Sequence, residues 1–373
     1  MKYIDEFRNL DIAEKLYRLI NEEAKDLCQV NFMEVCGTHT MAVERFGIRR
    51  TLPKNIGLIS GPGCPVCVTP KNYIDKAIAL TAIDDIIVFS FGDMLKVPGT
   101  KSSLLKQKSK GKVKVVYSAI DAAMFAENNK DKRIVFLGIG FETTVPTIAA
   151  SIKYAKKKKL KNFFVYSGHK IMPPAMKLLA GDKHVNIKGF LCPAHVSAII
   201  GIKSYTDICR KYNIPCVIAG FEPLDILQSI LMLVRQVKSK KAEVENQYNR
   251  VVKAQGNVKA LHLIDEVFSV NDSEWRGIGI IPKSGLILSK RYADFDIENN
   301  INLPEPKTSI DKGCICGSVL KGIKTPLECK LFSKKCNPNN PYGACMVSSE
   351  GACAAYYRYP APLASLGYGA GRK

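Results

Sequence analysis

The sequence predicts an α/β protein with two Rossmann-like domains, whose parallel sheets face a cleft, and a small cysteine-rich domain near the C-terminal end. Three features predict this arrangement. Short β-branched apolar segments alternate with helical segments, small and polar residues follow these apolar segments, and six cysteines crowd into residues 314–353. Strands that are apolar on both faces are typical of parallel sheets buried under crossover helices.

Eight segments carry the strand pattern, and we expect them to form two α/β units rather than one sheet. They are residues 31–35, 56–60, 85–91, 113–118, 133–139, 162–167, 187–192 and 214–220. Between most of them, as in 73–83 and 144–157, apolar residues recur three and four positions apart. This spacing predicts the helices that connect parallel strands.

The expected domains follow one another along the chain. Residues 1–95 are predicted to form the first α/β domain and residues 96–245 the second. Residues 246–373 are predicted to form a mixed C-terminal domain, whose tail is free to pack back on the first domain. We also expect a long amphipathic helix over 222–254 and a hairpin within 277–289, the segment GIGIIPKSGLILS.

The role expected of the 13 cysteines depends on the cellular compartment of the protein. The N-terminal segment is charged and helix-like, unlike a secretory signal, and no apolar run approaches the roughly 18 to 20 residues that span a bilayer. We therefore expect a cytoplasmic protein without a membrane partner. In that compartment clustered cysteines bind metal or carry out redox chemistry more often than they form structural disulfides.

The net charge of +21 raises the question of nucleic acid binding. The lysines lie in short runs at 106–114, 155–161 and 237–241, with no interleaved aromatic residues to stack on bases. We interpret them as a solvated surface, with an acidic protein partner as the alternative. Nucleic acid is not expected as a partner.

The loops that follow the strands hold the candidate site residues. In an open α/β sheet the carboxyl ends of the strands share one edge, where ligands bind. Three of the five histidines, His39, His169 and His195, fall in such loops, whereas His184 and His262 are expected to be structural. The loops are 36–40, 61–64, 92–93, 140–144, 167–170 and 192–195.

Standard nucleotide motifs do not fit these loops. The segment that begins Gly138-Ile139-Gly140 has Thr143 where a dinucleotide fingerprint has its third glycine, and there is no GxxxxGK[ST] phosphate loop. Thr143 and Thr144 instead predict N-caps for the helix that follows. Glu142 is then expected to point from the loop into the cleft.

The segment GPGCPVCVTP places Cys64 and Cys67 before a helix that we expect to begin at Thr69 and Pro70. The positive end of a helix stabilises a thiolate, which favours thiol exchange or metal binding. A single C-x-x-C does not separate these two uses, although the absence of a second one at zinc-finger spacing weakens the zinc interpretation. Two cysteines that merely pack are the structural alternative.

Cys36 stands among hydrogen-bond donors at Thr38, His39 and Thr40. A thiolate in such surroundings suits ferrous iron that carries small anionic ligands. The alternative is a cysteine nucleophile with His39 or His195 as its base. Position alone leaves both open.

The C-terminal cysteines predict a [4Fe-4S] cluster, because four thiolates that converge through glycine- and proline-rich loops supply all the protein ligands of a cubane. Structural zinc is the rival, although the spacings match no compact zinc site. Cys345 and the unused member of the Cys314/Cys316 pair are expected to be free thiols near the cluster. The expected ligands are Cys329, Cys336, Cys353 and either Cys314 or Cys316.

Six motifs, in this order and across nearly the whole chain, resemble the HypD family of [NiFe] hydrogenase maturation factors: CGTHT, GPGCPVC, GFETT, SGHKIMPPAM, CPAHVSAIIG and MVSSEGACAAYY. The resemblance implies a scaffold on which the Fe(CN)2CO unit is assembled in a stable complex with the small chaperone HypC. It implies that cyanide comes from HypE, which receives a carbamoyl group from HypF. It also implies two α/β domains around a cleft and a [4Fe-4S] cluster in a third.

Carried over by position, the resemblance makes Cys36 the protein ligand to the iron, shared with a thiolate of HypC. Thr38, His39 and Thr40 would hydrogen-bond to the iron's ligands. The alternatives are a passive iron metallochaperone whose metal cluster is structural, or an enzyme that reduces a precursor or forms the carbonyl ligand.

The resemblance assigns the remaining residues as well. Cys64 and Cys67 would form a dithiol/disulfide pair that exchanges electrons with the cluster. Glu142, His169 and His195 would be candidates for proton handling or partner contact.

Overall fold

The computed structural model describes residues 5–309 and 313–360. All eight predicted strand segments form strands, and together with a ninth they make two parallel sheets. Sheet A has the order β2-β1-β7-β8-β9, with β1 (Val30–Glu34), β2 (Ile56–Ser60), β7 (Gly189–Pro193), β8 (Cys216–Ala219) and β9 (Val244–Asn246). Sheet B has the order β4-β3-β5-β6, with β3 (Ile86–Ser90), β4 (Val113–Val115), β5 (Arg133–Gly138) and β6 (Phe163–Ser167). The predicted fold class is confirmed.

The sheets do not follow the order of the predicted domains. The chain starts sheet A with β1 and β2, builds all of sheet B with β3 to β6, and then returns to complete sheet A. The segments 1–95 and 96–245 therefore each supply strands to both sheets. Pairing follows packing rather than proximity in sequence: Gly189 of β7 leaves room for the ring of Phe32 on β1, where a Cβ would lie 2.9 Å from that ring.

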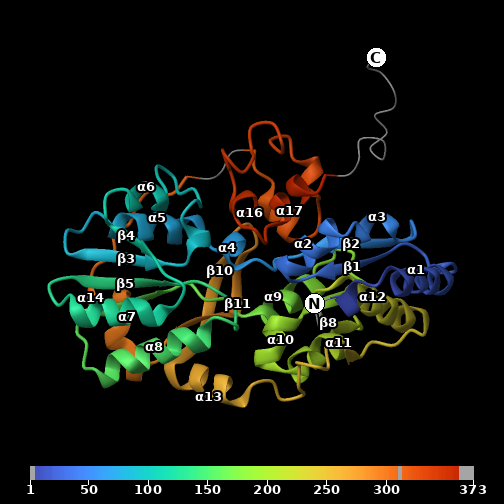
Figure 1. Cartoon of the computed structure of the whole chain (residues 1–373), viewed down its shortest axis with the longest axis horizontal. Coiled ribbons are helices and arrows are strands. Elements are labelled where there is room, and N and C mark those ends of the chain that lie inside the picture. The colour runs from blue at the N-terminus through green and yellow to red at the C-terminus, as the bar shows by residue number, and fades with distance from the viewer. Residues whose placement is uncertain (1–4, 310–312, 361–373) are drawn as a thin grey trace.

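Helices cover both faces of the sheets (Figure 1). One face of sheet A packs against α1 (Leu10–Ala24), α2 (Gly37–Arg45), α3 (Ile48–Thr51) and α12 (Pro223–Lys238). One face of sheet B packs against α7 (Ala119–Asn128), α8 (Val145–Lys157) and α13 (Val258–Val267). The remaining faces share one core with α4 (Pro65–Val68), α5 (Lys71–Leu80), α6 (Leu104–Lys108), α9 (Met172–Ala180), α10 (Ala194–Ile200) and α11 (Thr206–Tyr212).

The predicted helix over 222–254 is wrong in its length. Helix α12 ends at Lys238, and Lys240 adopts a left-handed φ of 55° that stops the helix. Val244 then pairs with Cys216, so that the chain adds β9 to the edge of sheet A. The apolar residues beyond the helix continue its spacing, but an open sheet edge offers their backbone a better partner.

The predicted hairpin within 277–289 is also misplaced. The antiparallel pair consists of β10 (Phe268–Trp275) and β11 (Gly279–Leu288), so the run belongs almost entirely to one strand. Gly277, with φ 71°, lies in the turn. The sequence Pro-Lys-Ser-Gly is a bulge instead of a turn: Lys283 has φ 53°, and the register shifts opposite it.

The C-terminal region is a compact set of loops and short helices that lies between the two sheets, at the top of Figure 1. Its helices are α15 (Cys316–Leu320), α16 (Ala344–Val347) and α17 (Ala352–Arg358), whereas the preceding helix α14 (Ile297–Asn300) lies apart from them and packs against sheet B. α17 packs against α2, and α16 packs against α4. None of the helices in the described part of the chain has the length and apolar character needed to span a bilayer.

Candidate functional site

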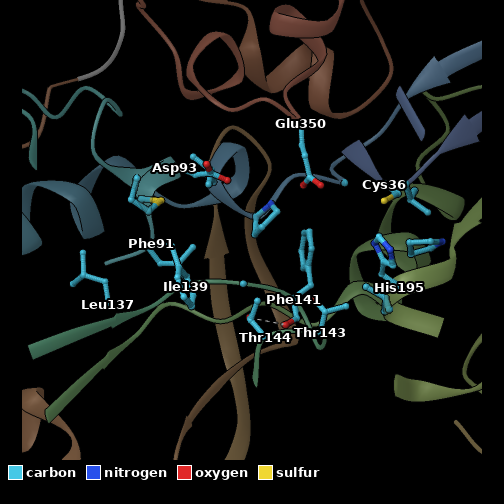
Figure 2. Close-up of a pocket in the computed structure, with 18 of the residues that line it drawn as sticks. Cys36, Phe91, Asp93, Leu137, Ile139, Phe141, Thr143, Thr144, His195 and Glu350 are labelled. Atoms are coloured by element: carbon cyan, nitrogen blue, oxygen red, sulfur yellow. Dashed lines mark hydrogen bonds between the residues drawn. The ribbon is translucent and has the colours of Figure 1, made fainter. Parts of the chain in front are cut away.

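A cavity of about 270 Å³ lies where the carboxyl edges of the two sheets meet the C-terminal region (Figure 2). The loops after β1, β2 and β7 of sheet A and after β3 and β5 of sheet B all contribute to its wall. This is the cleft that the order of strands and loops predicts. Its polar lining comes from Ser90, Asp93, Thr143, Thr144, His195 and Glu350, and its sulfur-bearing lining from Cys36 and Met94.

Cys36 is held at the start of α2 by three interlocked loops. The amide of Gly37 donates a hydrogen bond to the carbonyl oxygen of Gly63, at 3.1 Å. A Cβ on Gly37 would lie 2.3 Å from the carbonyl oxygen of Glu350, and a Cβ on Gly63 would lie 2.3 Å from the amide nitrogen of Cys36. The glycines of CGTHT and GPGC are therefore needed for close backbone approach.

The Cys36 thiol is 8% exposed and favours its protonated form. Burial, followed by the negative charge of Glu350, raises the pKa of Cys36 to about 11, although the amides of Thr38 and His39 oppose this shift. At neutral pH the thiol is then protonated unless a cation lies beside it. A bound metal ion deprotonates a coordinating thiol, so these surroundings suit a metal ligand better than an unassisted nucleophile.

Two carboxyl groups in the cavity were not among the predicted site residues. Glu350 points from the C-terminal region toward the space between Cys36 and Asp93 (Figure 2). Thr38 Oγ1 donates to Glu350 Oε1 at 2.8 Å, and burial, then the charge of Asp93, raises the pKa of Glu350. Asp93 lies in the predicted site loop after the third strand, and Glu350 lies in the MVSSEG motif. No spacing rule connects these segments with Cys36.

Of the three predicted histidines, only His195 reaches the cavity. Its exposed ring packs on Phe221 with centroids 4.2 Å apart, and partial burial lowers its pKa. His39 lies on the Phe221 ring as well, at 4.7 Å, but is completely buried. Its Nε2 lies 3.0 Å from the carbonyl oxygens of both Ala219 and Gly220.

Two acceptors at Nε2 require that this nitrogen of His39 carries the proton. Nδ1 then has a free lone pair, with no hydrogen-bond partner among the described residues. Burial lowers the pKa of His39 to about 4. Among the described residues no hydrogen bond joins the Cys36 thiol to the imidazole ring of His39 or His195, so the thiol and imidazole pair of a cysteine nucleophile is not assembled.

The expectation that Glu142 points into the cleft is wrong. Its Oε1 accepts a hydrogen bond from the amide of Met172, the first residue of α9, at 3.0 Å. Burial raises its pKa to about 7. The amides at the start of a helix have no partner within the helix, so they attract the Glu142 carboxylate more strongly than the cleft does. Thr144 holds the N-cap position of α8 but makes no side-chain cap, since its hydroxyl donates to the carbonyl oxygen of Phe141.

His169 and Thr40 also lie outside the cavity wall. His169 Nδ1 lies 3.0 Å from Ser167 Oγ, its ring packs edge-on against Phe268, and burial lowers its pKa to about 3. Thr40 donates to the buried carboxylate of Glu34 at 2.9 Å. Their contacts explain both residues as parts of the packed core.

Cys64 and Cys67 form a disulfide across the one-turn helix α4, with Cα atoms 5.2 Å apart. Their neighbours Gly63, Pro65 and Val66 line the cavity, so the buried disulfide lies directly behind its wall. The next helix, α5, begins at Lys71 with Pro70 as its N-cap, one position later than expected. Thr69 instead donates a side-chain hydrogen bond back to the carbonyl oxygen of Pro65.

The six C-terminal cysteines line one small apolar cavity of about 20 Å³. Within it Cys316 Sγ lies 2.9 Å from Cys345 Sγ. The amide of Tyr342 donates to Cys336 Sγ at 3.3 Å. The other lining residues are apolar side chains and a glycine: Ile315, Val319, Leu331, Phe332, Gly343 and Met346.

The donor chemistry of this cavity fits a thiolate-bound cluster, since none of the described residues in its wall carries a carboxylate or an imidazole. In the described residues, however, no three metal-binding side chains already have the arrangement of a metal site. Cys316 and Cys345 form one close pair of buried thiols, and the Cys316 thiol also interacts with that of Cys314. The remaining four are Cys314, Cys329, Cys336 and Cys353.

Comparison with known proteins identifies the family. The family model HypD, described as the hydrogenase formation hypA family, matches residues 11–360. The chain is 48% identical to hydrogenase maturation factor HypD2 of Bradyrhizobium diazoefficiens and 46% identical to hydrogenase maturation factor HypD of Azotobacter vinelandii. It is 45% identical to HypD of Cupriavidus necator, and each of the three alignments covers 96% of this chain and 97% of the relative. The chain therefore belongs to the HypD family and is a hydrogenase maturation factor.

Proposed function

We propose that this protein is the scaffold on which the Fe(CN)2CO unit of [NiFe] hydrogenases is assembled, with Cys36 as its ligand to the iron. The observation that carries the proposal is the cavity itself. Cys36 is the one cysteine among the described residues that line it, and Asp93, His195 and Glu350 surround the same space. Iron(II) bearing cyanide and carbon monoxide is soft enough to favour a thiolate.

The protonated state of Cys36 supports an iron cargo. A thiol with a pKa of about 11 stays protonated until a cation arrives, so it resists reaction while the cavity is free. Iron binding would release the thiol proton, and Glu350, whose pKa is raised by burial and whose charge acts on Cys36, is one group in the cavity that is able to accept it. His195 is the second group in the cavity that is able to take a proton.

Among the described residues the cavity supplies one cysteine, Cys36, and family membership implies a second thiolate from a partner. We propose that the stable partner is HypC, whose thiolate would share the iron with Cys36. HypE would bind transiently to deliver cyanide, after receiving its carbamoyl group from HypF. These partners follow from family membership and are expectations for this chain.

We also propose that thiol redox chemistry accompanies assembly. The Cys64–Cys67 disulfide lies behind the cavity wall, and α4, which carries Cys67, packs against α16, which carries Cys345. Cys345 in turn touches Cys316 in the cysteine-lined cavity. A [4Fe-4S] cluster held there by Cys314, Cys329, Cys336 and Cys353 would supply one-electron chemistry. The alternative, a passive iron metallochaperone with a structural cluster, leaves this succession of thiols without a use.

Infrared spectroscopy of the anaerobic complex with HypC tests the proposal. We expect Cys36→Ser to abolish the bands of iron-bound cyanide and carbon monoxide. Cys28→Ser is the matched control, because Cys28 is an exposed free cysteine outside the cavity, and it should keep the bands. Bands of normal intensity in Cys36→Ser would overturn the assignment of the iron ligand.

A further inference from the structure

A second groove, of about 490 Å³, lies between the loop after β3 and the C-terminal region. We call it the lysine groove, after Lys96, Lys101 and Lys106, which line it with Leu105. Its opposite wall consists of Pro338, Asn339 and Pro341. In Figure 1 helix α6, which carries Leu105 and Lys106, lies next to the C-terminal region at the upper edge of the molecule.

The lysine groove is uniformly basic. All three lysines are exposed, none forms an ion pair with another described residue, and no acidic side chain of the described chain lines the groove. Leu105, 43% exposed, adds an apolar surface among the charges. A basic rim around a small apolar contact suits a brief encounter with an acidic protein, because charge steers the approach and a small interface lets the partner leave.

The loop that carries two of these lysines is fixed in place. The carboxylate of Asp75 accepts hydrogen bonds from the amide and the hydroxyl of Thr100, both at 2.6 Å. The amide of Gly99 donates to the carbonyl oxygen of Ser102 at 2.9 Å. The charges at Lys96 and Lys101 are thus presented from an ordered turn.

The opposite wall connects the lysine groove with the cysteine-lined cavity. Residues 337–342 form one short loop, closed on itself by hydrogen bonds between Asn337 and Asn340. Pro338, Asn339 and Pro341 of this loop line the groove, while the amide of Tyr342 donates to Cys336 Sγ at 3.3 Å. Cys336 lines the cysteine cavity. A single loop therefore separates a basic surface groove from the thiols.

We propose that the lysine groove is the docking surface for an acidic one-electron carrier protein, whose electrons pass through the cysteine-lined cavity behind the loop to the Cys64–Cys67 disulfide. The proposal rests on the redox part of the proposed function. Each reduced carrier would lose one electron on docking. Two such electrons and two protons from solvent balance the cleavage of the Cys64–Cys67 S–S bond to two thiols.

Binding of a purified acidic [2Fe-2S] ferredoxin to the full chain tests the groove. We expect affinity at about 20 mM salt to fall roughly tenfold or more at about 200 mM salt, since the Debye length shrinks over this range. The triple variant Lys96→Glu/Lys101→Glu/Lys106→Glu should weaken binding at least ~10-fold at low salt. The basic carrier cytochrome c, used as a second probe, should not bind the wild-type chain.

The matched control is Lys130→Glu/Lys157→Glu/Lys161→Glu. It makes the same change in net charge on exposed lysines near the amino ends of β5 and β6, outside the groove. We expect it to change affinity less than ~3-fold. Equal weakening by both triple variants would show that only the overall charge matters and would overturn the docking surface, as would ferredoxin binding unaffected by the groove variant.

Two further measurements separate this proposal from the proposed function. Chemical reduction by dithionite should open the Cys64–Cys67 disulfide equally in wild type and groove variant, whereas reduction by ferredoxin should slow at least ~10-fold in the variant alone. A wild-type chain that lacks iron and sulfide in its cysteine cavity would overturn the proposed cluster. The binding comparison between the triple variants would still decide whether the groove is a docking surface.

Inorganic phosphate is the probe for a small-anion site. Tight binding of phosphate with no binding of ferredoxin would overturn the proposal of a carrier protein in favour of a small anion.

Discussion

Thr38 donates a hydrogen bond of 2.8 Å to Glu350, although 312 positions separate the two residues in the sequence. Thr38 follows the iron ligand that we propose, and Glu350 belongs to the loop between α16 and α17. The contact joins α2, which follows β1 of sheet A, to the C-terminal region at the wall of the cavity. The charge of Glu350 is also one of the causes of the raised pKa of Cys36.

The substitution Glu350→Gln should make Cys36 more reactive. It removes a negative charge but keeps an oxygen that accepts from Thr38, so the pKa of Cys36 should fall below its value of about 11. The measurement is the pH profile of iodoacetamide labelling of the Cys36 peptide, followed by mass spectrometry. Glu14→Gln, on the exposed face of α1, is the control, and an unshifted profile in Glu350→Gln would contradict the electrostatic role.

Acidification should destabilise the protein through buried neutral histidines. Burial lowers the pKa of His39 to about 4 and that of His169 to about 3, so between these values and the ordinary value of 6.5 the unfolded chain binds protons that the folded chain does not. Stability then falls as the pH falls below about 6.5, by about 1–3 kcal/mol for each histidine.

Urea unfolding at about pH 5 and about pH 7.5 checks this expectation. His169→Phe should reduce the difference between the two free energies of unfolding. His184→Asn, at an exposed position, should leave it unchanged. An identical pH dependence in wild type and His169→Phe would refute the contribution of His169.

A single methyl group at Gly37 should disturb both stability and the site. The Cβ of Gly37→Ala would meet the backbone of Glu350 at 2.3 Å, so the loop after α16 has to move. We expect a loss of about 1–3 kcal/mol in the free energy of unfolding and weaker iron loading. Gly92→Ala is the matched control from another loop of the site, since its nearest neighbour would be 3.7 Å away. Equal unfolding midpoints for the two variants would argue against the steric account.

Cys314 and Cys316 should differ in whether the cluster needs them. If Cys316 is paired with Cys345, Cys314→Ser should lose the cluster while Cys316→Ser keeps about four irons and four sulfides per chain. Iron and sulfide analysis with absorption spectroscopy, on anaerobically purified protein, measures this. Cys345→Ser is the companion control and should match Cys316→Ser. Loss of the cluster in Cys316→Ser with retention in Cys314→Ser would reverse the assignment.

The sequence was sufficient for the strands but not for their partners. Short, largely apolar runs mark β1 and β7, because both strands are buried on both faces. That β7 pairs with β1 rather than with β6 depends on contacts such as Phe32 against Gly189, which no local pattern reports. The predicted helix over 222–254 is too long for the same reason. Val244 keeps a helical spacing in the sequence, while its backbone joins a sheet edge.

The site was predictable where chemistry and strand position coincide, and less so elsewhere. Cys36 and His195 follow strand ends directly, and both line the cavity. Glu142 also follows a strand, but the start of α9 captures its carboxylate. Glu350 reaches the cavity from a loop outside either sheet, so the rule of strand ends does not find it.

The return of the chain to sheet A determines the order in which the two sheets are completed during synthesis. The strands β1 and β2 leave the ribosome first, yet β7, the neighbour of β1, follows only after the whole of sheet B has been made. Domains generally form as units while the chain grows, so sheet B is complete while sheet A is still an exposed pair of strands. Glu350 emerges later still. A truncated or unfinished chain therefore presents Cys36 without its carboxyl neighbour, and only molecules that include Glu350 possess the complete cavity wall.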